Sequence, residues 1–254
     1  MSAGSDKLVA MAWAGYREWA PPPALRQAIS CLWVRVVPET GAPPALVLPD
    51  ACSDLMWQQD RGAFVAGPDT GPNPSPLPPG SVIVGARFPP GAGGPALGVP
   101  LHELRNLRVD LVDLNRELAR WLPGDLAPEE ALDRLPRAAA ELVSVGPPDA
   151  LVRQGARLLN EPAATVEGAV QRLAVSERQL RRRFQAAVGY GPKTLHGVLR
   201  FRRFLERLDG QRSGEGLAEI ALDCGYADQA HLTRESSRLG GLPPAALARA
   251  RAAL

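Results

Sequence analysis

One stretch of this chain, residues 165–189 with the sequence TVEGAVQRLAVSERQLRRRFQAAVG, predicts two short helices joined by a tight turn. Ser176 stands where the second helix should begin, and Gln179 follows three residues later, which is the signature of a capping box. The apolar residues of both halves recur at helical spacing, so each predicted helix has one buried face. These residues are Val166, Ala169, Val170 and Leu173 in the first half, and Leu180, Phe184 and Val188 in the second.

The opposite face of the second predicted helix is rich in cations. It carries Arg178, Arg181, Arg182 and Gln185. A helix that docks by one face and presents arginines on the other suits the DNA major groove, because arginine donates two hydrogen bonds to guanine and also holds phosphates. The alternative is a solvated basic helix on an ordinary α domain, since short basic patches also arise by chance.

Residues 217–240, LAEIALDCGYADQAHLTRESSRLG, repeat this layout. The apolar stripe of the first helix consists of Leu217, Ile220, Ala221 and Cys224. Gly225, which tolerates positive φ, ends that helix, and Asp228 is a good N-cap for the next one. The polar face that would read DNA carries Gln229, His231, Thr233 and Arg234. Two helix-turn-helix units are therefore predicted, joined by one long helix that begins near Pro192.

Together these stretches resemble the DNA-binding domain of the AraC/XylS family of transcription regulators. The resemblance covers residues 162–247 and rests on SERQLRRRFQAAVGYGPKTL, VLRFRRFLERL, LAEIALDCGYADQAHLTRE and GLPPAAL, in this order. It implies an all-α domain that places two recognition helices in successive major grooves of double-stranded promoter DNA, about 34 Å apart. It also makes RNA polymerase a candidate partner.

One position departs from the family pattern. The family usually has an aromatic residue after the Thr-Arg-Glu stretch of the second recognition helix, where this chain has Ser236. A serine in an empty phenylalanine pocket would cost about 3–5 kcal/mol. Three alternatives follow: the second unit packs loosely, another side chain fills the pocket, or this unit reads DNA weakly. A second function class therefore stays open, an interaction protein with a degenerate second unit that acts mainly through protein contacts.

The charge of the chain is divided between its two parts. The 254 residues carry a formal net charge of +2, but residues 151–254 hold 17 Lys and Arg against 10 Asp and Glu, and residues 1–150 hold 12 against 17. A basic C-terminal part suits phosphate. No apolar run is long enough for a transmembrane helix, and the N-terminus is not a convincing signal peptide. The three cysteines have no paired spacing, so we expect a cytoplasmic protein without contact to a membrane.

Residues 1–124 have a different character. Short runs rich in branched and aromatic residues predict strands, with Pro, Gly and Asp between them as turns. These runs are residues 31–37, 45–49, 54–59, 63–67 and 81–88, whereas residues 67–80 are expected to be a loop because prolines at that density cannot pair in a sheet. The region resembles, in architecture and in the stretch LPDACSDLMW, the cupin-like sensory domain of AraC-type regulators. The resemblance implies a small-molecule effector or a dimer contact.

The N-terminal region lacks the residues that an enzyme of this architecture would need. No histidine precedes His102, which excludes a histidine-rich metal site in the predicted sheet. A nucleophilic arrangement of Cys52, His102 and Asp54 has no motif context. We therefore expect no catalytic residue, no metal and no cofactor. The candidates for a ligand pocket are Trp33, Trp57, Phe64 and Phe88 as apolar lining, with Asp50, Asp54 or Arg87 as the polar contact.

Three helical stretches are predicted between the two parts: residues 100–122, residues 128–143 with a kink or break at Pro136, and residues 149–159. They either cover the sheet within one chain or form the contact of a homodimer. The predicted fold class is α+β with two domains, a β-rich cupin-like N-terminal domain with helices and an all-α C-terminal domain. We expect a sensory domain over residues 1–124, a helical covering or dimerisation segment and linker over residues 125–161, and an AraC-type DNA-binding domain over residues 162–254.

Overall fold

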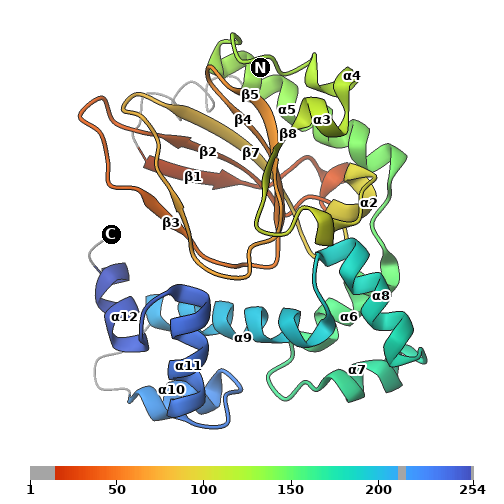
Figure 1. Cartoon of the computed structure of the whole chain (residues 1–254), viewed down its shortest axis with the longest axis vertical. Helices are drawn as coiled ribbons and strands as arrows, with labels where there is room; N and C mark the ends of the chain where they lie inside the picture. Colours follow the sequence, from red (N-terminus) through yellow and green to blue (C-terminus); the bar gives the residue numbers. More distant parts are fainter. Residues whose placement is uncertain (1–14, 211–215, 253–254) are drawn as a thin grey trace.

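The computed structural model describes residues 15–210 and 216–252. Its N-terminal part is built on a six-stranded antiparallel sheet with the order β1-β2-β7-β4-β5-β8, and a separate two-stranded ribbon pairs β3 with β6 (Figure 1). The strands are β1 (Gly15–Trp19), β2 (Cys31–Val36), β3 (Ala45–Val47), β4 (Ser53–Gln58), β5 (Gly62–Ala66), β6 (Asn73–Ser75), β7 (Val82–Phe88) and β8 (Arg108–Asp110).

The strand predictions are confirmed in the sheet interior and less well at its margins. The runs at residues 31–37, 54–59, 63–67 and 81–88 form β2, β4, β5 and β7, while the run at residues 45–49 contributes only β3 of the ribbon. The prediction that residues 67–80 are entirely loop was wrong. Pro74 lies in β6, opposite Leu46 of β3. A ribbon of two strands leaves each strand one free edge, and a proline without an N–H is tolerated at such an edge.

Short helices connect the strands and one long helix covers the sheet: η1 (Pro23–Leu25), α2 (Gly93–Leu97), η2 (Leu101–Glu103), α3 (Leu111–Leu114), α4 (Arg116–Ala119) and α5 (Pro128–Val145). The prediction of one helical stretch over residues 100–122 was wrong, because β8 lies inside it and a break at Asn115 separates α3 from α4. The Asn115 side chain accepts a hydrogen bond from the Leu118 amide at 2.9 Å and so begins a new helix. The predicted break at Pro136 does not divide α5.

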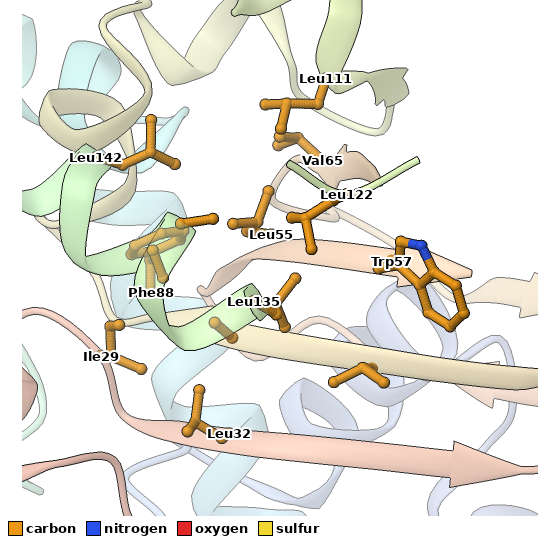
Figure 2. Packing of buried hydrophobic residues seen from close by; sticks show 14 of the residues in the cluster. Ile29, Leu32, Leu55, Trp57, Val65, Phe88, Leu111, Leu122, Leu135 and Leu142 are labelled. Carbon is orange, nitrogen blue, oxygen red and sulfur yellow. The ribbon is translucent and has the colours of Figure 1, made fainter. Parts of the chain in front are cut away.

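The first hydrophobic core lies between α5 and one face of the sheet. Leu55 and Trp57 of β4 and Phe88 of β7 are fully buried there. Figure 2 shows Leu135 and Leu142 of α5 among these side chains. The apolar stripe of α5 is therefore used within the chain, as the covering alternative predicted for residues 128–143.

The C-terminal part consists of helices around a second core. They are α6 (Ala150–Leu159), α7 (Val166–Leu173), α8 (Glu177–Val188), α9 (Pro192–Asp209), α10 (Leu217–Asp223), α11 (Gln229–Gly240) and α12 (Pro244–Ala252). Helix α9 runs between the group α6–α8 and the group α10–α12 (Figure 1). Phe201 and Phe204 of α9 are fully buried at the centre of this core. The predicted two units and their joining helix are thus present as separate helix groups on one long helix.

Candidate functional site

Helices α7 and α8 form the first helix-turn-helix unit, and their turn is built from local hydrogen bonds. Ala174 ends α7 in the left-handed conformation with φ of 51°. The Gln179 amide then donates to Ser176 Oγ at 3.2 Å, and the Ser176 amide donates to Gln179 Oε1 at 3.1 Å. The predicted capping box is therefore confirmed. Phe184, fully buried, fixes the inner face of α8 against α6, where the absence of a side chain at Gly155 leaves room for its ring.

The outer face of α8 is free and positively charged. Arg178, Arg181 and Arg182 are exposed, and none of them has a hydrogen bond or ion pair with any residue that the structure describes. Gln185 is half-buried. The next arginine differs, because Arg183 Nε donates to Asp149 Oδ2 at 2.9 Å and ties α8 to the start of α6. One arginine of the run thus serves the fold, and three remain available to an anionic partner.

Helices α10 and α11 form the second unit with the same design. Gly225 has φ of 84°, and a Cβ atom there would lie 2.7 Å from the Pro162 carbonyl oxygen. Asp228 accepts a hydrogen bond from the His231 amide at 2.6 Å and caps α11. The glycine and the N-cap predicted for this turn are therefore confirmed.

The four polar residues predicted for the reading face of α11 divide into two pairs. Gln229 and Arg234 are exposed, and their side chains make no hydrogen bond within the described part of the chain. His231 is half-buried and meets the Tyr226 ring edge-on at 5.3 Å. Thr233 Oγ1 donates to the Gln229 carbonyl oxygen at 2.9 Å. Gln229 and Arg234 are therefore better placed to meet a partner than His231 and Thr233.

Ser236 is accommodated as a buried polar residue. It is fully buried, and its Oγ donates to the Leu242 carbonyl oxygen at 2.8 Å, so its hydrogen-bonding requirement is met. One turn further along the same helix face, a Cβ atom on Gly240 would lie 2.9 Å from Phe201 Cζ. The Phe201 ring of α9 thus packs along the face of α11 that carries Ser236.

The arginines of α9 include residues that hold the domain together, a role that the sequence left open. Arg200 Nη2 donates to Glu235 Oε2 of α11 at 3.0 Å, and Arg203 donates to the Asn160 and Cys224 carbonyl oxygens at 2.8 and 3.2 Å. Although burial raises it, hydrogen bonds from Arg238 and Arg200 bring the pKa of Glu235 below its ordinary value. These contacts set the position of α11 relative to α9, and no sequence pattern marked them.

A cavity of about 410 Å³ lies on the other face of the sheet, between that face and the β3–β6 ribbon. Five of the seven predicted ligand-pocket residues line it: Trp33, Asp50, Asp54, Phe64 and Arg87. The placement of the other two, Trp57 and Phe88, in a pocket was wrong. Side chains alternate along a strand, so Trp57 points away from its neighbours Met56 and Gln58 into the first core. There its Nε1 donates to the Pro123 carbonyl oxygen at 2.7 Å.

One end of the cavity carries a compact group of charges. Trp33 Nε1 donates to Asp54 Oδ1 at 2.7 Å, and Arg87 Nε lies 3.3 Å from the same oxygen and 3.5 Å from Asp50 Oδ2. Burial raises the pKa of Asp54 to about 6 although Arg87 opposes the shift. Gly85 makes this arrangement possible, because a Cβ atom there would lie 2.1 Å from the Trp33 ring.

Sequence reasoning missed several residues of this cavity: Arg35, Met56, Gln58, Arg61, Ile83 and Arg108 line it too. The signal was the alternation along β2, β4 and β7, which assigns Arg35 to the face of Trp33. Within the described residues, no three His, Cys, Asp or Glu side chains cluster as a metal site. Among the helices of those residues, none has the length and apolar character to cross a membrane.

The first helix-turn-helix unit also contacts the N-terminal part of the chain. Helix α2 packs on the C-terminal half of α8, and a Cβ atom on Gly94 would lie 2.4 Å from the Ala186 carbonyl oxygen. At the end of α8, Gly189 meets Pro68, where a Cβ atom would lie 2.4 Å from the proline ring. Gly93, beside Gly94, touches Ser53 at the start of β4. The strand that carries Asp54 is thus connected to α8 through α2.

Two helix-turn-helix units on one long helix, the first with a free arginine face, define a double helix-turn-helix DNA-binding domain. Residues 169–250 match the family described as a helix-turn-helix domain. The C-terminal part of this chain is an AraC-type helix-turn-helix domain, the domain of a class of DNA-binding transcription regulators. Residues 17–110 match a domain of unknown function (DUF6597).

Solved structures of ToxT from Vibrio cholerae have a distantly similar arrangement of a β-rich N-terminal region and a helical C-terminal region. Apo ToxT from strain SCE256 is 10% identical, with a TM-score of 0.45 over 86% of this chain and 96% of ToxT. ToxT from strain O395 is 8% identical, with a TM-score of 0.44 over 85% and 95%. ToxT with a bound unsaturated fatty acid is 10% identical, with a TM-score of 0.41 over 81% and 89%. No curated protein sequence matches the chain significantly.

Proposed function

We propose that this protein is a sequence-specific transcription regulator that reads DNA through α8 and α11 and is controlled by a small effector in the N-terminal cavity. One observation carries the proposal: Arg178, Arg181 and Arg182 project from a well-capped helix and have no partner within the described residues. Side chains held free on a rigid helix suit base edges and phosphates. Gln185, at the half-buried margin of the same face, would complete the contact.

The second unit contributes through the exposed residues of α11. Gln229 and Arg234 would approach the next major groove, and His231 and Thr233 would support the start of the helix. The alternative of a degenerate second unit rested on Ser236. The hydrogen bond of this residue to Leu242 and its full burial support an ordered α11 that can serve as a second reading helix.

Control by an effector is supported by the path from the cavity to α8. Asp54 lines the cavity, its neighbour Ser53 touches Gly93, and Gly94 lies against the backbone of α8. A ligand can shift an equilibrium only by its differential affinity for two states. A ligand that moves β4 by a fraction of an ångström would change the fit of α2 on α8, because no side chain at Gly94 cushions that contact.

The remaining parts of the proposal follow from this function. Residues 1–124 form the cupin-like sensory domain, residues 125–161 the covering segment and linker, and residues 162–254 the DNA-binding domain. The protein acts in the cytoplasm on promoter DNA, with RNA polymerase as a partner. A homodimer contact beside the covering role of α5 stays a prediction.

The test is fluorescence anisotropy of the full chain on labelled DNA from upstream of its own gene, with random DNA of equal length as reference. Three proteins are compared: wild type, a variant with Arg178, Arg181 and Arg182 all changed to Ala, and a control. The control changes Arg105, Arg116 and Arg120 to Ala, which are exposed arginines of the N-terminal part and remove the same charge.

We expect the wild type and the control to prefer the upstream DNA, and the α8 variant to lose this preference. Equal binding by all three proteins would contradict the assignment of α8. A loss in both variants would show that only net charge matters, which would contradict reading of bases.

A further inference from the structure

Arg35 is the one cation of the cavity wall without a counterion among the residues that the structure describes. It lies on β2 beside Trp33, on the cavity face, and it has neither a hydrogen bond nor an ion pair there. Burial, with no opposing charge, brings the pKa of its guanidinium below its ordinary value. A partly buried guanidinium without a partner is an energetic cost that an anionic ligand would remove.

The other arginines of the cavity are already neutralised. Arg87 lies within 3.3 and 3.5 Å of Asp54 and Asp50. Arg108 holds Asp69 by two hydrogen bonds of 2.6 and 3.1 Å. Arg61 donates to Asp110 at 2.7 Å, and its guanidinium lies over the Phe64 ring, 3.7 Å from the centroid. The sequence singled out Arg87 as the contact for a ligand, but its charge is used inside the protein.

Arg35 and the acidic group occupy opposite ends of the cavity floor. Arg35 pairs with Ile83 in the register of β2 and β7, whereas Arg87 lies four residues further along β7. At about 3.3 Å per residue, the two positions are about 13 Å apart. Asp50 and Asp54 would repel an anion from the Arg87 end, so an anionic group is directed to Arg35.

The surface between these ends is apolar. Trp33, Ile83, Met56 and Leu77 form one cluster, and Phe64 extends it across the sheet. The volume of about 410 Å³ lies near the lower end of the range of ligand pockets, about 300–1,000 Å³. Such a cavity suits a compact molecule with one charged group and an apolar body.

We propose that the effector is a small monocarboxylate with an aromatic or aliphatic body, whose carboxylate pairs with Arg35 and whose body lies on the floor of Trp33, Met56 and Ile83. The planar guanidinium matches a carboxylate by two parallel hydrogen bonds. Gln58, whose side chain has no hydrogen bond within the described residues, flanks Ile83 on the other side and offers an amide donor to the second oxygen. A phosphate dianion is disfavoured, because it would need more cations than this end supplies.

This inference deepens the proposed function, since it names the class of effector, and its test reads ligand binding without DNA. Isothermal titration calorimetry at pH 7.5 is performed on the full chain with hexanoate, decanoate, 4-butylbenzoate and 1-naphthoate, and with the primary amide of each. The variants are Arg35→Gln, Arg35→Lys and, as matched control, Arg61→Gln, whose exposed partner Asp110 does not require it. Thermal melting of each variant confirms that it is folded.

We expect at least one carboxylate to bind the wild type and its amide to bind about 10- to 100-fold more weakly, as a lost charged hydrogen bond predicts. Arg35→Gln should show the same loss, while Arg35→Lys and Arg61→Gln should retain binding within a few-fold. The inference is overturned if no carboxylate binds at millimolar concentration, if acid and amide bind equally, or if Arg35→Gln binds as the wild type does. DNA binding without carboxylate binding would contradict this inference alone, and carboxylate binding without DNA binding would contradict the proposed function alone.

Discussion

Replacement of Ser236 by phenylalanine distinguishes a filled from an empty pocket in the second helix-turn-helix unit. If the serine stood in an empty aromatic pocket, Ser236→Phe would recover about 3–5 kcal/mol of stability. The structure instead has Ser236 fully buried, bonded to the Leu242 carbonyl oxygen at 2.8 Å, with the Phe201 ring against the next turn of the same face. We therefore expect Ser236→Phe to destabilise the C-terminal domain.

The magnitude has two contributions. Inserting a ring into a packed core costs about 1–3 kcal/mol, and a buried carbonyl left without its donor costs about 1–3 kcal/mol, so the free energy of unfolding should fall by about 2–6 kcal/mol. Urea unfolding followed by far-UV circular dichroism measures it, because the helices of this domain dominate that signal. Ser237→Phe is the control, since Ser237 is the exposed neighbour and should change stability little. A higher unfolding midpoint for Ser236→Phe than for the wild type would refute the reasoning.

Two further predictions concern the N-terminal part. Gly94→Ala should lower the melting temperature of the full chain, because its Cβ atom would lie 2.4 Å from the Ala186 carbonyl oxygen, whereas Gly216→Ala, with open space around it, should not; equal melting temperatures in calorimetry would show that α2 does not press on α8. Burial raises the pKa of Asp54 from 3.8 to about 6, so the folded chain binds this proton more tightly than the unfolded chain. Stability from this group is therefore full below about pH 4 and is lost by about 3 kcal/mol as pH rises through 6. Asp54→Asn should flatten the urea midpoint between pH 4 and 6, and an unchanged pH profile would argue against the buried carboxyl.

The helical part of the fold was predictable from local signals. The capping box of Ser176 and Gln179, the positive φ of Gly225 and the N-cap Asp228 are each written within a few residues of sequence. The apolar stripes of α8 and α11 follow from helical spacing alone. The same spacing gives the outward direction of Arg178, Arg181 and Arg182.

The margins of the sheet and the polarity of the cavity were not predictable in the same way. Strand β8 is three residues long and depends on β5 for its hydrogen bonds, so no local pattern marks it. Trp57 and Trp33 have similar sequence surroundings, and only the pairing of strands decides which face each one meets. The division of the arginines into Arg87, which is neutralised, and Arg35, which is not, depends on contacts between residues far apart in the sequence.

The most direct test of DNA reading by α8 is the salt dependence of binding to the upstream DNA, measured by anisotropy for the wild type and for the triple alanine variant of Arg178, Arg181 and Arg182. Each lost phosphate contact should reduce the slope of log Kobs against log salt by about 0.9. We predict a flatter slope for the variant and loss of its preference for the upstream DNA over random DNA. An unchanged slope with unchanged preference would contradict the account, because it would mean that α8 does not touch DNA.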